Sequence, residues 1–363
     1  MKKVVVGMSG GVDSAVCAIL LKSAGYEVIG VTLRTWQSDD GLDSRCCEID
    51  DARSAAEKIG IPFYPFNCTE AFRKKVVEPF ISEYAHGFTP NPCIGCNRSV
   101  KWEYLLYYAR VLGADYVATG HYASVVKTES GRYTVKKALH SEKDQTYMLC
   151  ALTQEQLSAT LMPLGDLSKS EVRRIAAEAG LEVASKPDSQ EICFITDGNY
   201  ADFIEKNAGT SLAGEGAFVD ESGNVLGLHK GIIHYTVGQR KGLGLALGRP
   251  VYVKEINTRR NEVVIGDEES LYSRKLLCRK LNFMSIDVPQ VGEPVPCTAK
   301  VRYRHSGERA VITLLDHDLL SVEFETGVRA ACPGQSAVFY DEEGCVIGGG
   351  VIAEVLPDQE NSL

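Results

Sequence analysis

A glycine-rich loop between an apolar strand and a helix constrains this chain more than any other feature. The apolar run Val4-Val5-Val6 leads into Ser9-Gly10-Gly11-Val12-Asp13-Ser14, and a helical pattern follows. A junction of this kind leaves several backbone N–H groups without helical acceptors near the positive end of the helix dipole. The two glycines permit positive φ and close backbone approach, while the serine hydroxyls and that of Thr32 add donors. The loop is therefore predicted to bind phosphate.

Two common phosphate-binding patterns are absent from this loop, which narrows the class of nucleotide-binding protein. No lysine follows the glycines, so the Walker A pattern is absent, and the dinucleotide pattern G-x-G-x-x-G is absent here as well. The remaining pattern, S-G-G-x-D-S, resembles the pyrophosphate loop of enzymes that split ATP into AMP and pyrophosphate. The structural alternative is an ordinary strand-to-helix turn with a helix cap at Ser14.

Composition limits the class of protein. A chain of 363 residues with 44% hydrophobic and 24% charged residues is typical of a soluble enzyme of two or three domains. No apolar run is long enough to cross a bilayer and no signal-peptide pattern opens the chain, so we expect a cytoplasmic protein without a membrane partner. The 12 cysteines are then expected to be thiols, metal ligands or catalytic groups. The net charge of -9 neither predicts nor excludes nucleic acid.

The first half of the chain alternates β-branched runs with helical periodicity, which predicts an α/β fold with a parallel sheet. The expected strands are 3–7, 27–32, 63–66 and 116–119. Ligands bind beyond the carboxyl ends of such strands, so the glycine loop and Thr119-Gly120-His121 should meet over one nucleotide.

The second half changes to short alternating strands separated by turns, which predicts two small β domains, the last a barrel. The expected strands are 217–220, 225–228, 251–257, 261–265, 297–303, 309–314, 321–324 and 336–340. The expected domains are 1–205 for the catalytic α/β part, 206–273 for the central β part and 274–363 for the barrel.

Two cysteine-bearing segments have unusual surroundings. Pro90 and Pro92 precede a C-x-x-C pattern that ends at Cys96, where the expected start of a helix would lower a thiol pKa. Cys193 lies in an apolar, strand-like run after a polar segment, and taken alone it would be predicted as a buried, inert cysteine.

Several motifs follow one another through nearly the whole chain. They are Gly7-Met8-Ser9-Gly10-Gly11-Val12-Asp13-Ser14, Thr89-Pro90-Asn91-Pro92, Cys96-Asn97, Ala118-Thr119-Gly120-His121-Tyr122, Lys143-Asp144-Gln145, Ile192-Cys193-Phe194, Gly238-Gln239-Arg240-Lys241-Gly242, Arg302-Tyr303-Arg304, and Pro333-Gly334-Gln335-Ser336-Ala337-Val338-Phe339-Tyr340. In this order they closely resemble the tRNA-specific 2-thiouridylases, the MnmA family. The resemblance implies an ATP-pyrophosphatase (adenine nucleotide α-hydrolase-like) domain followed by two β domains. It also implies a reaction that replaces the C2 oxygen of the anticodon wobble uridine with sulfur.

The resemblance assigns roles to individual residues. ATP would be bound by Gly7, Met8, Ser9, Gly10, Gly11, Val12, Asp13, Ser14, Leu33 and Gly120. Asn91, Pro92 and Cys93 would lie beside the target base, and the tRNA would contact His121, Lys143, Asp144, Gln145, Arg302, Tyr303 and Gln335. Cys193 resembles a persulfide carrier and Cys96 its partner nucleophile.

The expected chemistry begins with ATP, because oxygen is a poor leaving group until it is esterified. The uridine oxygen attacks the α-phosphate, the glycine loop holds the departing pyrophosphate, and Mg²⁺ offsets its charge. Asp13 is a candidate metal ligand or, equally, a helix cap. Sulfur from Cys193 then displaces AMP, and Cys96 can release that sulfur, leaving a Cys96–Cys193 disulfide to be reduced.

The sulfur route has two open forms. Where the family often has aspartate this chain has Cys93, so Cys93, Cys96 and Cys193 offer three ligands for an iron–sulfur (4Fe–4S) cluster with one open iron. The cluster and persulfide routes are equally compatible with the sequence, and zinc is less so. The adjacent Cys46-Cys47 pair is expected to be structural or incidental.

The expected partners are a tRNA with a wobble uridine and a sulfur-donor protein such as a cysteine desulfurase or a sulfur relay. A flipped-out base needs a basic surface, for which Arg240, Lys241, Arg302 and Arg304 are candidates. Two other functions stay open: an ATP-dependent synthetase with a non-RNA acceptor, and a non-catalytic RNA-binding module.

Overall fold

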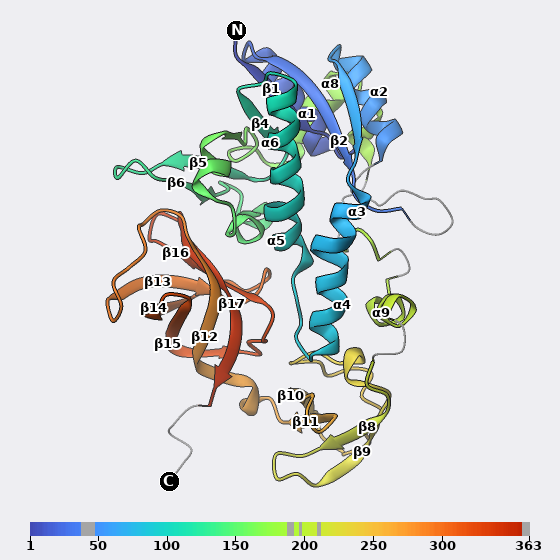
Figure 1. The fold of residues 1–363 in the computed structure, drawn as a ribbon, viewed down its shortest axis with the longest axis vertical. Helices are drawn as coiled ribbons and strands as arrows, with labels where there is room; N and C mark the ends of the chain where they lie inside the picture. Colours follow the sequence, from blue (N-terminus) through green and yellow to red (C-terminus); the bar gives the residue numbers. More distant parts are fainter. Residues whose placement is uncertain (38–47, 187–191, 196–197, 209–211, 358–363) are drawn as a thin grey trace.

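The computed structural model describes residues 1–37, 48–186, 192–195, 198–208 and 212–357. Figure 1 shows an α/β part that holds the N-terminus, a small β-sheet part at the opposite end, and a barrel beside them. Cys46, Cys47 and most of the polar segment before Cys193 lie outside the described residues.

The α/β part is built on a parallel sheet, as the sequence predicts. Its strands are β1 (Lys3–Gly7), β2 (Glu27–Arg34), β3 (Phe63–Asn67), β4 (Tyr116–Thr119) and β7 (Thr160–Leu161), in the order β3-β2-β1-β4-β7. Every neighbouring pair in this sheet is parallel.

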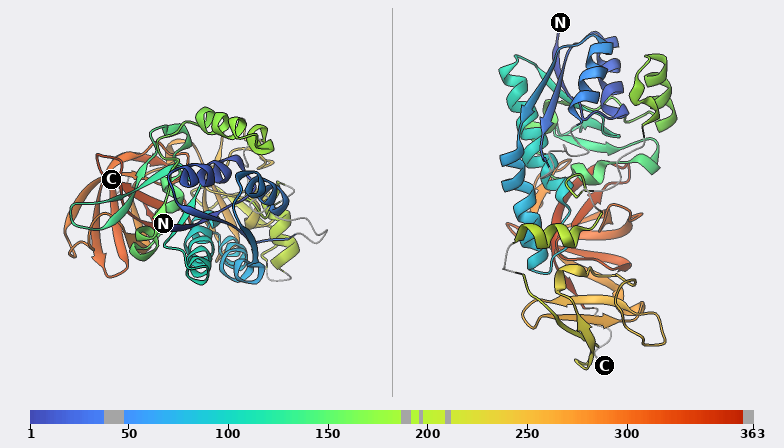
Figure 2. Two further views of the ribbon diagram at one scale, coloured as in Figure 1. Left: turned by 90° about the horizontal axis from the view of Figure 1, so that it is seen from above. Right: turned by 90° about the vertical axis from the view of Figure 1, so that its right-hand side faces the viewer.

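Helices cover both faces of this sheet, which explains why β1 is a continuous apolar run. Val4 and Val6 pack with α1 (Val12–Ser23), α2 (Ile49–Ile59) and α8 (Lys169–Glu178). Val5 faces the opposite side and packs with α6 (Trp102–Val111). Figure 2 shows these two helical layers.

Two long helical rods run between the sheet and the β parts (Figure 1). One consists of α3 (Thr69–Phe72), the π-helix η1 (Arg73–Val77) and α4 (Glu78–Ala85). The other consists of α5 (Pro92–Cys96), the π-helix η2 (Asn97–Lys101) and α6, and α5 packs against η1. A π-helical turn in each rod is a feature often found at functional sites.

The start of the second rod corrects the sequence prediction. Asn91 is the N-cap and Pro92 is the first helical residue, where the fixed φ of proline is favourable and its missing N–H costs nothing. Cys93, rather than Cys96, therefore lies in the first turn, and Cys96 lies one turn further along.

Smaller elements complete the α/β part. They are the hairpin of β5 (Ala123–Lys127) and β6 (Tyr133–Lys137), the 3₁₀ turns η3 (Ser141–Lys143), η4 (Thr146–Leu149) and η5 (Glu182–Ser185), and the helices α7 (Gln154–Ser158) and α9 (Tyr200–Ala208).

The central sheet contains β8 (Gly216–Val219), β9 (Val225–His229), β10 (Tyr252–Asn257) and β11 (Glu262–Gly266), in the order β10-β11-β8-β9. The turn η6 (Ile232–His234) packs against both α4 and α9, so this sheet is attached to the base of the first rod. The turn η7 (Glu269–Leu271) leads into the barrel.

The last part is a closed barrel, as predicted. Its strands are β12 (Tyr272–Phe283), β13 (Pro294–Lys300), β14 (Glu308–Asp316), β15 (Leu319–Arg329), β16 (Ser336–Tyr340) and β17 (Val346–Leu356), closed in the order β12-β15-β14-β13-β16-β17. The predicted strand 297–303 is wrong at its end, because β13 stops at Lys300. Arg302 and Tyr303 lie in the turn that follows.

Candidate active site

The glycine loop between β1 and α1 is held by its own hydrogen bonds. The backbone N–H of Ser9 donates to Ser14 Oγ (3.1 Å), and that hydroxyl donates to the carbonyl of Gly11 (3.0 Å). The Thr32 hydroxyl donates to the carbonyl of Met8 (2.6 Å), so it supports the loop and is not the phosphate donor that the sequence suggests. Gly10 has φ +83°, and a Cβ there would lie 2.6 Å from the carbonyl oxygen of Glu48. Contacts within the protein therefore fix the shape of the loop.

The turn after β4 meets this loop. A Cβ on Gly120 would lie 2.6 Å from the carbonyl carbon of Asp13 and 2.7 Å from the nitrogen of Ser14. Only glycine allows the two backbones to approach this closely. The structure thus brings together the two segments that the sequence predicts to meet over one nucleotide.

Asp13 is neither a helix cap nor isolated. Gly11 is the N-cap of α1, while the Asp13 carboxylate accepts from Tyr122 Oη (2.8 Å) and pairs with Lys169 Nζ (2.7 Å and 2.9 Å). Lys169 is a site residue that the sequence analysis does not identify, since it is far from the loop in the chain. The available signal is Ser168-x-x-Glu171, a capping box that marks the start of a helix immediately before Lys169.

Two of the residues predicted to bind ATP, Met8 in the loop and Leu33 on the adenine side, are buried. Met8 is 2% exposed and Leu33 is 8% exposed. Leu33 is on β2, while Met8 follows β1 directly at the start of the glycine loop.

The target-base segment is fixed at its N-terminal side by the barrel. Asn91 Oδ1 accepts from the backbone N–H of Cys93 (3.1 Å), and Cys93 is half-buried. Two residues earlier, the N–H of Thr89 donates to the carbonyl of Pro333 (2.9 Å), and Gln335 Nε2 donates to the carbonyl of Thr89 (2.7 Å). Gln335, predicted to contact tRNA, thus bonds the backbone that directly precedes the predicted target-base segment.

Of the two predicted catalytic cysteines, Cys96 is the last residue of α5 in the second rod, and Cys193 precedes Phe194, which packs on the first rod. Cys96 is buried in the hydrophobic cluster that contains Phe194, and Cys193 packs against the same cluster. The ring of Phe194 lies 5.6 Å from that of Phe72 and 5.3 Å from that of Phe80, on either side of η1. Since α5 packs against η1, both cysteine segments converge on this rod.

Two cysteine predictions change. Cys193 lies in a turn that is closed by a hydrogen bond from the N–H of Ile195 to the carbonyl of Ile192 (3.0 Å), not in a strand. Within the part of the chain that the structure describes, no three His, Cys, Asp or Glu side chains are placed to hold a metal ion. Cys93, Cys96 and Cys193 are therefore not assembled as cluster ligands in this conformation.

The residues predicted to contact tRNA form linked contacts near the Gly120 turn. The Gln145 side chain accepts from the N–H of Tyr122 (3.0 Å), and the buried Asp144 carboxylate accepts from the Thr146 hydroxyl (2.8 Å). Tyr303 Oη reaches from the barrel to the carbonyl of Asp144 (3.2 Å). Lys143 and Arg302 are both half-buried.

The surroundings of the His121 imidazole favour its neutral form. It lies 5.5 Å from the ring of Trp102, and its Nδ1 is 2.9 Å from Thr119 Oγ1. Burial, with the charge of Lys101 as a smaller contribution, lowers the pKa of His121 to about 3. The imidazole therefore offers a hydrogen bond rather than a positive charge.

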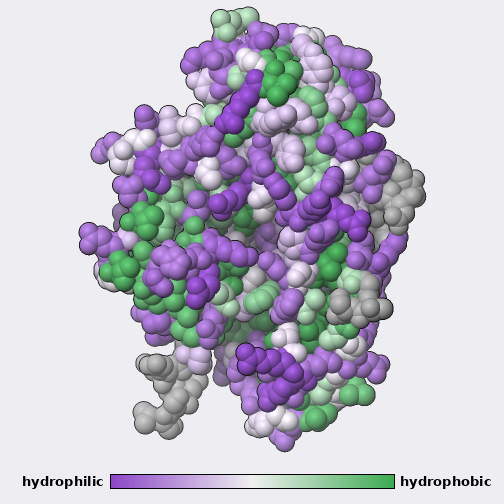
Figure 3. Space-filling model, in the orientation of Figure 1, coloured by the Kyte–Doolittle hydropathy of each residue, from purple (hydrophilic) through white to green (hydrophobic). Residues whose placement is uncertain are grey.

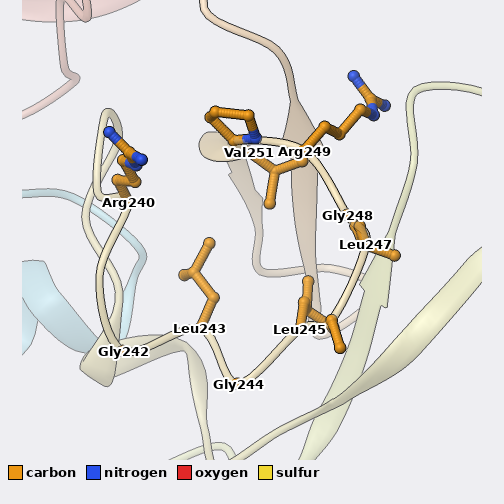
Figure 4. Close-up of a pocket in the computed structure, with 11 residues that line it drawn as sticks. Arg240, Gly242, Leu243, Gly244, Leu245, Leu247, Gly248, Arg249 and Val251 are labelled. Carbon is orange, nitrogen blue, oxygen red and sulfur yellow. The ribbon is translucent and has the colours of Figure 1, made fainter.

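A second glycine-rich loop, residues 240–251, surrounds a hollow of about 520 Å³ in the central part. Arg240 and Arg249 are exposed and lie at its two sides, with Leu243 between them (Figure 4). The molecular face in Figure 3 is mostly hydrophilic. Among the described helices, none is long and apolar enough to cross a membrane.

Comparison with known proteins covers all three parts of the fold. Family models described as tRNA methyl transferase HUP domain, tRNA methyl transferase PRC-barrel domain and aminomethyltransferase beta-barrel domain match residues 2–197, 201–267 and 273–352. A tRNA-specific 2-thiouridylase MnmA of Lachnoclostridium phytofermentans is 53% identical over 359 residues, 97% of this chain and 99% of the relative. This chain belongs to the tRNA-specific 2-thiouridylase family.

A second member of the family, a tRNA-specific 2-thiouridylase MnmA of Clostridioides difficile, is 50% identical over 361 residues, 98% of this chain and 99% of the relative. Among solved structures, the U34-tRNA thiolase NcsA from Methanococcus maripaludis with its 4Fe–4S cluster has a TM-score of 0.35 and 21% identity, over 58% of this chain and 67% of that one. The family predicted from the motifs is confirmed, and so is the fold class.

Proposed function

We propose that this chain is an ATP-dependent tRNA sulfurtransferase that makes 2-thiouridine at the anticodon wobble position. The observation that carries this proposal is the match to 2-thiouridylases along nearly the whole chain. The pairing of the glycine loop with the Gly120 turn supports ATP as the activating substrate, because it builds a phosphate site at the carboxyl end of a parallel sheet.

In the activation step, the uridine C2 oxygen attacks the α-phosphate of ATP and pyrophosphate leaves. Residues from Gly7 to Ser14, together with Gly120, orient the phosphates through backbone N–H groups. Mg²⁺, when bound, offsets the phosphate charge. Asp13 would hold it through the carboxylate oxygen that Lys169 alone contacts, in place of Lys169, since Mg²⁺ in phosphate sites usually takes one or two carboxylates.

In the sulfur step, Cys193 carries a persulfide. The Cys96 thiolate attacks the inner sulfur of Cys193, forming the Cys96–Cys193 disulfide and releasing hydrosulfide beside the activated base. Hydrosulfide adds to C2 and AMP leaves with the original oxygen. A cellular thiol reductant then supplies two electrons and two protons to restore both cysteines. A sulfur-donor protein, such as a cysteine desulfurase or a sulfur relay, reloads Cys193.

The tRNA lies across the α/β part and the barrel in this proposal, in the cytoplasm where tRNA is modified. Asn91, Pro92 and Cys93 border the flipped base. The anticodon region is held by His121, Lys143, Asp144, Gln145, Arg302, Tyr303 and Gln335. Asp144 and Gln335 act through the backbone groups that they bond, and the others through direct contacts. Arg240 and Arg249 extend the basic surface toward the central part.

The persulfide and cluster routes predict different activities for the Cys93→Asp variant. The described residues do not assemble three cysteine ligands, so no step here passes through a cluster. We expect Cys93→Asp to retain full thiolation activity in iron-free enzyme. Anaerobic purification with iron and sulfide assays, followed by thiolation assays on both proteins, checks this. Stoichiometric iron in the wild type and loss of activity in Cys93→Asp would instead support the cluster.

The function itself is tested in cells. Bulk tRNA from cells that lack the gene should lose the retarded 2-thiouridine bands on a mercury-containing gel, and a plasmid copy of the gene should restore them. A copy carrying Cys193→Ser should not. Unchanged 2-thiouridine in the gene-deleted cells would contradict the proposal.

A further inference from the structure

The hairpin of β5 and β6 connects the barrel to the turn that meets the glycine loop. β5 begins at Ala123, directly after Gly120-His121-Tyr122, and Figure 1 shows the hairpin projecting from the α/β part above the barrel. The residues predicted to bind ATP all lie in the α/β part. The barrel can therefore affect ATP binding only through intervening contacts, and the hairpin supplies a continuous set of them.

Arg132, at the tip of the hairpin, attaches it to the end of the barrel strand β12. The Arg132 Nε donates to the carbonyl of Met284 (2.9 Å), and its Nη2 donates to the carbonyl of Phe283 (2.9 Å). Its Nη1 pairs with Asp287 (2.9 Å), whose side chain is 88% exposed, while that of Arg132 is 24% exposed. The rigid fork of a guanidinium on two adjacent carbonyls fixes orientation as well as position. The tip of the hairpin is therefore held in one orientation on the barrel.

The barrel also contacts β6 along its length. The Thr134 hydroxyl is fully buried and donates to the carbonyl of Val346 (2.6 Å). The N–H of Lys137 donates to the carbonyl of Gly344 (2.9 Å), and Lys137 pairs in the hairpin with Ala123, the first residue of β5. Only one strand therefore separates the barrel from the residue that follows the Gly120 turn.

The start of β5 is in turn fixed to the glycine loop. Tyr122 precedes Ala123, and its hydroxyl donates to Asp13 Oδ1 (2.8 Å). The backbone of Tyr122 is held on both sides by Gln145, whose N–H donates to its carbonyl (3.0 Å) and whose side chain accepts from its N–H (3.0 Å). Because Gly120 packs directly on the backbone of Asp13, a shift of this turn also displaces the glycine loop.

We propose that Arg132 is a positioning residue for ATP, which holds the Gly120 turn in place by anchoring the hairpin to the barrel. The barrel then shapes the ATP site from outside, through β6 and β5. ATP binds at full affinity only when the barrel is docked, which links the activation step to the part of the protein that contacts tRNA in the proposed function. This inference rests on the proposed function, because it takes ATP as the substrate.

The test measures ATP affinity without tRNA, so that contacts between the barrel and tRNA do not enter the result. Titration calorimetry of the full-length protein with a non-hydrolysable ATP analogue gives the dissociation constant. Arg132→Met keeps an unbranched side chain but removes all three donors, and it should weaken binding at least about fivefold, as expected for coupling through packed contacts. Thr134→Val removes one buried hydrogen bond with little change of shape, and it should weaken binding by a smaller factor.

Asn282→Ala is the matched control, because it loosens the same end of β12 without touching the hairpin. The Asn282 side chain donates to the carbonyls of Cys150 (2.8 Å) and Leu152 (3.0 Å). This variant also loses two hydrogen bonds between the barrel and the α/β part, yet it should change ATP affinity by less than about twofold. Equal weakening of ATP binding in Asn282→Ala and Arg132→Met would overturn the proposal, because the effect would then come from general loss of barrel docking.

The wild-type titration distinguishes failure of this inference from failure of the proposed function. If the wild type binds the ATP analogue, and Arg132→Met and Thr134→Val bind it with the same affinity, the hairpin does not position the site while the ATP-dependent activity stands. If the wild type does not bind the analogue, the ATP-dependent function itself is contradicted.

Discussion

Replacing Cys193 with serine should lower 2-thiouridine formation by at least about a thousandfold while tRNA affinity stays within about twofold of the wild type. A serine hydroxyl cannot carry a persulfide and is almost never ionised near neutral pH, so no sulfur reaches the base. Binding should survive because Cys193 is a half-buried side chain in a turn and its neighbour Phe194 provides the packing against the first rod.

The measurement that isolates the chemical role is tRNA-dependent release of pyrophosphate. Cys193→Ser should still adenylate the base and release pyrophosphate, because activation precedes sulfur transfer. Cys297→Ser, which removes another half-buried thiol from a barrel strand, should leave both activities unchanged. Sustained 2-thiouridine production by Cys193→Ser would remove Cys193 from the mechanism.

Cys96→Ser should form as little 2-thiouridine as Cys193→Ser, but its reaction should stop after the persulfide has formed. The persulfide on Cys193 can form but is not released, so mass spectrometry should find one extra sulfur atom on the peptide that contains Cys193. Finding that extra sulfur in neither the wild type nor Cys96→Ser, with sulfur donor supplied, would contradict the persulfide route.

The parts of the site that sequence predicts well are those set by local chain geometry. A β-branched run, two glycines and a helical pattern are enough to place β1, the phosphate loop and α1, because each depends on neighbours in the chain. The parallel sheet follows from the alternation of strands and helices. Gly120 is predictable because it follows β4 at the edge of the sheet where the loop also lies.

The parts that sequence misses depend on contacts between distant segments. Lys169 reaches Asp13 only because α8 packs on α1, and nothing in the loop indicates it. In the barrel, β17 contains Gly348-Gly349-Gly350, which weakens its strand pattern. A Cβ on Gly348 would lie 2.4 Å from the carbonyl oxygen of Asn282, so glycine is required there by the close packing of β17 on β12.

Gly120→Ala should reduce tRNA-dependent pyrophosphate release by about a hundredfold, comparable to a displacement of about 1 Å at a reacting centre. The added methyl group would lie 2.6 to 2.8 Å from three backbone atoms of Asp13 and Ser14, none of which belongs to a flexible side chain. The turn after β4 must therefore separate from α1. That movement also strains the hydrogen bond from Tyr122 to Asp13 and shifts the backbone donors of the glycine loop.

A general loss of stability could also lower pyrophosphate release in Gly120→Ala, and it can be distinguished experimentally from the local effect. Overpacking of one methyl group typically costs about 1–3 kcal/mol, which would lower the melting temperature by a few degrees but leave the folded protein with normal activity at a lower temperature. Gly214→Ala is the matched control, because a Cβ there meets no atom within 4 Å. If Gly120→Ala regained wild-type pyrophosphate release on cooling, the close approach at Gly120 would serve folding alone. If the loss of pyrophosphate release persists in fully folded protein and tRNA affinity is unchanged, the close approach at Gly120 serves the activation step. Only that step requires both turns to bind the same nucleotide.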